Sequence, residues 1–242
     1  MAAKRMRVFA GPNGSGKTTI FKEILNKEKI NLGVYINADE IEIDLSSGKL
    51  NFDKFQIVTT NDVLRTYISN SGFATAKRNE PDLAQKLTVI DNELIVDTFI
   101  DSYLAAEIAE FIRQNLLTAG ISFTFETVMS HNNKVQFLQK AKEAGFRVYL
   151  YFIATEDPAI NVNRVKLRVE QLGHNVAETV IHSRYYKSLA NLRQAITFSD
   201  RAYIFDNSGL NANLIAQITD GVDVNINDAV ATPNWVVECL SN

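Results

Sequence analysis

The chain has 242 residues, 25 basic and 28 acidic, so its net charge is −3 at pH 7, which argues against a protein that coats nucleic acid. Hydrophobic residues at 46% and charged residues at 22% exclude wholesale disorder and fibrous repeats. No apolar run approaches the roughly 20 residues that span a bilayer, so we expect no membrane partner. The length and the single cysteine predict one cytoplasmic domain over residues 1–242 that carries an appendage.

Five short runs of β-branched and aromatic residues alternate with helical stretches along most of the chain. These runs are apolar on both faces, as is typical of central strands in a parallel sheet. They cover residues 7–10, 34–37, 121–125, 147–153 and 201–205. The alternation predicts an α/β fold in which helices flank a five-stranded parallel sheet.

The strongest motif of the sequence follows the first of these strands. Residues 11–18 match the phosphate-loop pattern G-x-x-x-x-G-K-[ST] between a predicted strand and a predicted helix. In such a loop, backbone N–H groups converge on phosphate oxygens, Lys17 reaches the β and γ phosphates, and Thr18 is a magnesium ligand. The motif therefore predicts a P-loop NTPase fold whose nucleotide site consists of Gly11, Pro12, Asn13, Gly14, Ser15, Gly16, Lys17, Thr18 and Thr19.

Carboxylates follow the second and third predicted strands, at Asp39 and at Glu126 before Thr127. With strand order 2-3-1-4-5, as in small phosphate-loop kinases, they stand about 10 and 5 Å from the phosphate loop at about 4.8 Å per strand. Asp39 is then placed to orient an acceptor hydroxyl and take its proton, and capping of the next helix is its alternative role. We expect Glu126 and Thr127 on the acceptor side, with Glu126 holding the acceptor, holding a water on magnesium, or capping a helix.

Residues 46–101 interrupt the alternation and show no strand pattern. The apolar residues Val63, Leu64, Tyr67 and Ile68 recur at helical spacing. We therefore predict a helical insert that caps the acceptor site.

The segment after the fourth strand, residues 157–192, is basic. Arg164 and Arg168 lie four residues apart, so a helix places both on one face, and Arg184 follows a predicted flexible tip at residues 172–175. A mobile lid at this point would close over the nucleotide and supply a catalytic arginine to the transferring phosphoryl group. An ordinary basic surface helix is the alternative.

Residues 210–242 form the predicted C-terminal appendage. Alternation from Val222 to Ile226 predicts an edge strand or a hairpin, and Pro233 starts a final helix that includes Trp235. Asp206 and Asn207, which end the fifth strand, are expected to form a turn rather than to contact the nucleotide base.

Taken in order, these motifs resemble the zeta toxin family of phosphate-loop kinases. The resemblance extends over residues 5–209, although residues 46–101 match poorly. It is carried by residues 11–19, Asn37-Ala38-Asp39-Glu40-Ile41, Phe125-Glu126-Thr127, and the lid with Arg164, Arg168, Gly173-His174 and Arg184-Tyr185. It implies a kinase that uses ATP and magnesium, with Asp39 as the catalytic aspartate and Glu126 on the acceptor side. It further implies a UDP-N-acetyl amino sugar, phosphorylated on its 3′-hydroxyl, as acceptor, and a small helical antitoxin as partner.

We therefore predict an ATP-dependent kinase that transfers the γ-phosphoryl group to a hydroxyl of a small molecule. The alternative is a nucleotide-binding switch or regulatory ATPase without a small-molecule acceptor. Asp39, Glu126 and the lid arginines favour transfer, because a switch needs a water-positioning residue and a nucleotide-sensing segment that the sequence does not display. A nucleic-acid end kinase is the third choice, which the acidic charge balance disfavours.

Overall fold

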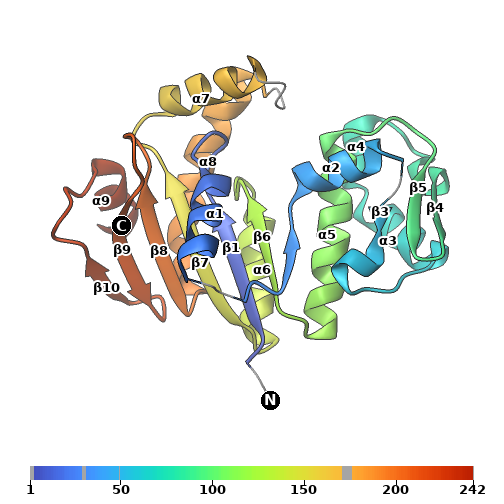
Figure 1. The fold of residues 1–242 in the computed structure, drawn as a ribbon, viewed down its shortest axis with the longest axis horizontal. Helices are drawn as coiled ribbons and strands as arrows, with labels where there is room; N and C mark the ends of the chain where they lie inside the picture. Colours follow the sequence, from blue (N-terminus) through green and yellow to red (C-terminus); the bar gives the residue numbers. More distant parts are fainter. Residues whose placement is uncertain (1–2, 29–30, 49, 171–175, 242) are drawn as a thin grey trace. The chain divides into compact units, whose positions relative to one another are not determined.

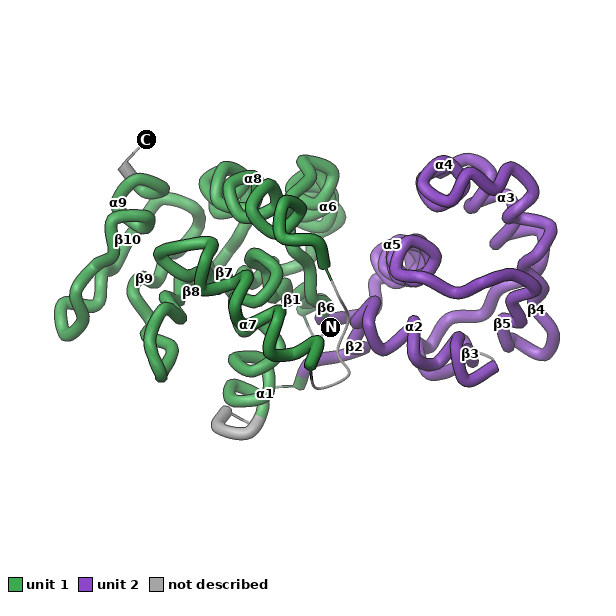
Figure 2. Tube along the Cα trace, turned by 90° about the horizontal axis from the view of Figure 1, so that it is seen from above, with its two compact units in different colours: residues 1–31, 125–242 green, residues 32–124 purple. Residues whose placement is uncertain are grey.

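The computed structural model describes residues 3–28, 31–48, 50–170 and 176–241. The predicted tip at residues 172–175 lies outside the described residues. Two compact units divide the chain, Met1–Asn31 with Phe125–Asn242 and Leu32–Thr124, coloured green and purple in Figure 2. The first is called unit 1 and the second unit 2.

A seven-stranded sheet has the order β10-β9-β8-β7-β1-β6-β2 (Figure 1). Its strands are β1 (Arg5–Ala10), β2 (Val34–Ile36), β6 (Phe123–Thr127), β7 (Arg147–Ala154), β8 (Arg201–Asp206), β9 (Asn213–Thr219) and β10 (Asp223–Ile226). β1, β7 and β8 pair in parallel, whereas β8, β9 and β10 pair antiparallel. The prediction of five strands is therefore wrong in number, because the C-terminal segment adds two antiparallel strands to the sheet. Within the seven-stranded sheet, the five predicted strands lie in the predicted order 2-3-1-4-5. The hairpin predicted in that segment is confirmed as β9–β10.

Helices cover both faces of the sheet in unit 1. α1 (Lys17–Glu28) packs on one face, where Phe21 meets the ring of Phe9 at a centroid distance of 5.2 Å. α6 (Asn132–Glu143), α8 (Glu178–Thr197) and α9 (Asn234–Ser241) pack on the other face (Figure 2). The final helix predicted after Pro233 is confirmed as α9. Both faces are covered because β1 and β7 are apolar on both, as expected of central parallel strands.

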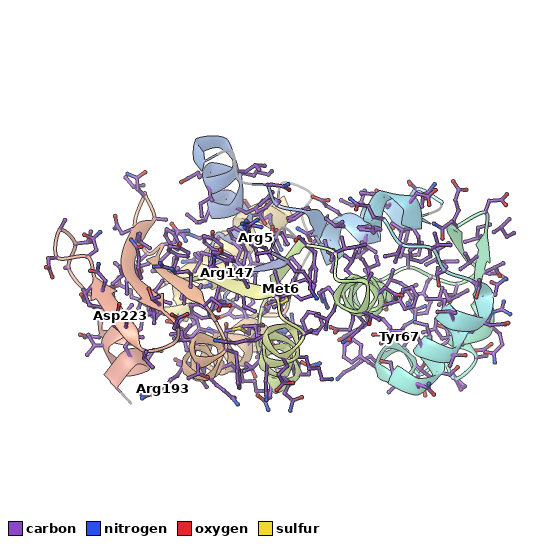
Figure 3. The ribbon with its side chains drawn as sticks, turned by 90° about the horizontal axis from the view of Figure 1, so that it is seen from below. Arg5, Met6, Tyr67, Arg147, Arg193 and Asp223 are labelled. Atoms are coloured by element: carbon purple, nitrogen blue, oxygen red, sulfur yellow. The ribbon has the colours of Figure 1, made fainter. Side chains whose placement is uncertain are left out.

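The parallel register brings three loops to one end of the sheet. Arg5 pairs with Arg147 at the amino ends of β1 and β7, which lie close together in Figure 3. At the other end, Ala154 pairs with Asp206. The loops that follow β1, β7 and β8 therefore leave the same end, which is where ligands bind in open α/β sheets.

Unit 2 combines helices with a small sheet of its own. The helices are α2 (Ala38–Ser46), α3 (Asn61–Ser71), α4 (Phe73–Arg78) and α5 (Ser102–Ala119), with 3₁₀ turns η1 (Phe52–Phe55) and η2 (Leu83–Lys86). β3 (Leu50–Asn51), β5 (Glu93–Val96) and β4 (Leu87–Ile90) form an antiparallel sheet in that order. The prediction that residues 46–101 contain no strand is therefore wrong. None of the helices in the described ranges has an apolar stretch long enough to cross a bilayer.

Candidate active site

The phosphate loop turns from β1 directly into α1. The Gly11 N–H donates to the Thr127 carbonyl at 3.2 Å, which anchors the start of the loop on β6. Lys17 opens α1, and its Nζ donates to the carbonyls of Gly11 and Pro12, at 2.9 Å each. The loop therefore encloses the positive N-terminal end of a twelve-residue helix, which is a favourable place for phosphate.

A hydroxyl and a carboxylate meet beside this helix end. Thr18, in the first turn of α1, donates through Oγ1 to Glu126 Oε2 at 2.8 Å. Glu126 lies within β6, not after it as its sequence position had implied. Both groups are oxygen donors of the kind that Mg²⁺ accepts, and Mg²⁺ usually takes its remaining ligands from water and substrate phosphates. The pair therefore fits a magnesium ion, although the described residues contain no group of three His, Cys, Asp or Glu that could hold a metal without such help.

Two asparagine side chains hold the phosphate loop from outside. Asn161, in α7 (Pro158–Glu170), donates through Nδ2 to the Asn13 carbonyl at 2.6 Å. Asn207, directly after β8, donates through Nδ2 to the Ser15 carbonyl at 2.8 Å. The turn predicted at residues 206–207 therefore contributes a side chain to the phosphate loop.

The three lid arginines have different surroundings. Arg164, on α7, donates through Nη1 to the Asn207 carbonyl at 2.7 Å and through Nη2 to the Gly209 carbonyl at 3.2 Å. Arg184, on α8, lies with Nη1 3.5 Å from Asn13 Oδ1 of the phosphate loop. Arg168 is exposed one turn along α7 from Arg164. Arg184 thus has a side-chain contact to the phosphate loop.

α8 is fixed to the carboxyl ends of two strands near Arg184. Tyr185 Oη donates to the Thr155 carbonyl after β7 at 2.6 Å, and burial raises the pKa of this phenol, so it stays protonated. Ser188 and Asn191 donate to the carbonyls of Val128 and Met129 after β6, at 2.8 Å each. These bonds hold the α8 segment that carries Arg184 at the end of the sheet where the phosphate loop lies.

Asp39 lies in unit 2, in the first turn of α2. The helix is capped by Asn37, whose Oδ1 accepts from the Asp39 N–H at 2.9 Å. The alternative that the Asp39 side chain caps this helix is therefore wrong. Its carboxylate is exposed and interacts favourably with the helix N-terminus.

A model of the zeta toxin family matches residues 102–215. The resemblance found in the sequence is confirmed. The zeta toxin match includes Glu126 and the three lid arginines, whereas the phosphate loop and Asp39 precede it. It supports a phosphotransferase.

This chain is also similar to one further protein in sequence and to two crystal structures of another protein pair. An uncharacterized protein of Haemophilus influenzae is 40% identical over 65 residues, which are 27% of this chain and 46% of that protein. The crystal structure of AvrRxo1-ORF1 with AvrRxo1-ORF2 and sulphate ions has a TM-score of 0.53 at 14% identity, and the structure of the pair with ATP has 0.50 at 14%. Each match covers 94% of this chain and 62% of that chain, so the present chain spans less than two thirds of its structural relative. At this identity the likeness establishes an α/β fold with a mostly parallel central sheet.

Proposed function

We propose that the protein is an ATP-dependent kinase that transfers the γ-phosphoryl group to a hydroxyl of a small molecule. The observation that carries the proposal is the bond between Thr18 and Glu126 at the N-terminal end of α1, directly after a phosphate loop. The zeta toxin match and the ATP complex of AvrRxo1-ORF1 support it.

The residues of unit 1 would divide the work on the nucleotide. Lys17 would exchange the carbonyls of Gly11 and Pro12 for phosphate oxygens, which accept more strongly from a cation. Thr18 would ligate magnesium directly, and Glu126 would hold the ion or one of its waters. When bound, magnesium neutralises negative charge on the phosphates.

Arg184 is our choice for the arginine that stabilises charge on the transferring phosphoryl group. It contacts the phosphate loop at Asn13, and its helix is anchored by Tyr185 and Ser188. A guanidinium held in place needs little reorganisation when charge develops, which is the condition for electrostatic catalysis. Arg168, which is exposed, remains the second candidate.

Asp39 would act on the acceptor. A carboxylate can orient the acceptor hydroxyl and accept its proton as the phosphoryl group transfers. Asp39 is available for this role because Asn37 caps α2. We propose a nucleotide sugar of the UDP-N-acetyl amino sugar type as acceptor, and a small protein partner of the antitoxin kind, as the AvrRxo1-ORF1:AvrRxo1-ORF2 pair supports.

The test is incubation of the protein with γ-labelled ATP, Mg²⁺ and a panel of UDP-sugars, with and without an N-acetylated amino group. We expect label on an N-acetyl amino sugar, and no label with its 3′-deoxy analogue or with the Lys17→Ala protein. Release of labelled phosphate at the same rate with and without every acceptor would contradict the proposal and support the regulatory ATPase.

A further inference from the structure

Two glycines of the phosphate loop are packed closely against residues from other segments, Gly14 against Asn161 of α7 and Gly16 against Asn207 after β8. A Cβ at Gly14 would stand 2.5 Å from the Asn161 carbonyl oxygen, and a Cβ at Gly16 would stand 2.3 Å from Asn207 Nδ2. Both glycines have positive φ, of 75° and 91°. These positions therefore need glycine not only for the turn but also because α7 and the segment after β8 press against the loop.

The side-chain amides of Asn161 and Asn207 bind the carbonyls that directly precede Gly14 and Gly16 in the chain. Asn161 donates to the Asn13 carbonyl, and Asn207 donates to the Ser15 carbonyl. In a trans peptide the C=O and the following N–H point in opposite directions. The Asn161 side chain thus directs the Gly14 N–H away from itself, and the Asn207 side chain does the same for the Gly16 N–H.

The orientation of each asparagine is itself fixed. Asn161 is fully buried, and its Oδ1 accepts from the Thr155 hydroxyl, which leaves Nδ2 to face the loop. The backbone of Asn207 is held from both sides, because its N–H donates to Ala154 and its carbonyl accepts from Arg164. Arg164 also binds the Gly209 carbonyl, so one guanidinium fixes this turn.

We infer that Asn161 and Asn207 are positioning residues that turn the N–H groups of Gly14 and Gly16 toward the nucleotide phosphates, and that Arg164 acts through Asn207. This inference rests on the proposed function only in that the loop binds a nucleoside triphosphate. In this inference Arg164 maintains the conformation of the loop, and another arginine stabilises the charge of the transition state.

Asn207 carries the test, because replacing the fully buried Asn161 also costs stability. Asn207→Ala removes one amide donor and should weaken ATP binding about fivefold, the scale of one hydrogen bond. Asn207→Asp keeps the size of the side chain but sets a carboxylate against the Ser15 carbonyl, so it should weaken binding more than alanine does. A packing role alone would give the opposite order, since aspartate fills the site better than alanine.

Tripolyphosphate, which has no base, is the second probe. If Asn207 orients the loop, Asn207→Asp weakens the binding of ATP and tripolyphosphate by the same factor. A loss of ATP affinity with unchanged tripolyphosphate binding would place Asn207 at the nucleotide base and overturn the inference.

Asn227→Asp is the matched control, since Asn227 Nδ2 donates to the Leu214 carbonyl at 2.9 Å in the β9–β10 region. ATP binding should be unchanged in this variant. Equal ATP affinities for the Asn207→Asp and Asn227→Asp proteins would also overturn the inference.

A double-mutant cycle tests Arg164. If Arg164 acts through Asn207, the losses of ATP affinity in Arg164→Ala and Asn207→Ala are not additive in the double variant. Additive losses would show that Arg164 works independently of Asn207. All these readouts measure binding, so failure to find a phosphorylated acceptor would refute the proposed function and leave this inference to its own results.

Discussion

Two polar clusters of the molecule differ in what their charged groups bind. Around the phosphate loop of unit 1, Lys17 and Arg164 donate to backbone carbonyls of loops, and Thr18 donates to Glu126. In unit 2, the side chain of Arg78 is 0% exposed and binds Glu80 and Asp101 in ion pairs of 2.8 and 2.7 Å.

The Arg78 cluster is complete in itself. Its guanidinium also donates to Thr98 Oγ1 and to the Phe99 carbonyl, and it lies 3.8 Å from the centre of the Phe99 ring. Asp101 in turn caps α5 by accepting from the Leu104 N–H at 2.9 Å. This cluster ties α4 to the start of α5, whereas the phosphate-loop cluster places the Lys17 ammonium where a nucleotide would accept from it. The comparison predicts that substitutions in the phosphate-loop cluster reduce activity, whereas substitutions in the Arg78 cluster reduce stability.

The largest loss of activity is expected from Arg184→Ala. An arginine that stabilises transition-state charge contributes about 10³- to 10⁵-fold to the rate, so transfer should fall on that scale with little change in melting temperature. Lys187→Ala is the matched control, because Lys187 is exposed on the same helix. Turnover of the Arg184→Ala protein within tenfold of wild type would exclude this residue and leave Arg168 for the same measurement.

The next largest loss is expected from Lys17→Ala. Removing a preorganised donor to the phosphates should reduce transfer by about 10²- to 10³-fold. Circular dichroism and the melting temperature should stay near wild type, because Nζ binds carbonyls of a loop. Lys22→Ala, on the exposed side of α1, provides the comparison. If the Lys17→Ala protein were inactive because it is unfolded, the result would contradict the claim that substitutions in the phosphate-loop cluster affect activity and not stability.

A smaller loss is expected from Asp39→Asn. Loss of a positioned general base should lower transfer by roughly 10²-fold while ATP affinity changes little. Stability should also change little, because Asn37 and not Asp39 caps α2. Glu40→Gln removes the neighbouring charge of the same helix turn and serves as the control. Normal transfer in Asp39→Asn would leave Asp39 with only its interaction with the helix N-terminus.

How far the sequence predicted the structure depended on the range of the signal. The phosphate loop lies between β1 and α1, as its motif required, and the final helix begins after Pro233 as predicted. These features are set by residues close together in the chain. The bonds of Asn161 and Asn207 to the loop join residues 148 and 192 positions apart, and no local pattern marks them.

The three strands of the small antiparallel sheet in unit 2 were missed for a different reason. β3, β4 and β5 have only two to four residues each, which is too short for alternation to stand out. A signal was nevertheless present at Asp91-Asn92, where φ is 51° and 63°. A two-residue turn of this kind between Ile90 and Glu93 is typical of a tight hairpin, and Asp and Asn are among the residues that tolerate it.

The smallest effect is expected at Glu80, where the comparison can be sharpened through pH. Burial alone would raise the pKa of Glu80, but hydrogen bonds from Thr98, Lys86 and Arg78 lower it from 4.5 to about 2. Because the pKa is lower in the folded state, ionised Glu80 stabilises the fold fully above about pH 4.5, and this contribution is lost as the pH falls toward 2. Glu80→Gln should therefore lower stability by about 2 kcal/mol at neutral pH and by progressively less below pH 4.5.

Asp82→Asn is the control, since Asp82 pairs with the same Lys86 at 3.2 Å from an exposed position, where an ion pair contributes little. Thermal unfolding of the three proteins between pH 7 and pH 2 measures the effect. A stability difference between wild type and Glu80→Gln that stayed constant over that range would show that the Glu80 charge does not hold this cluster together.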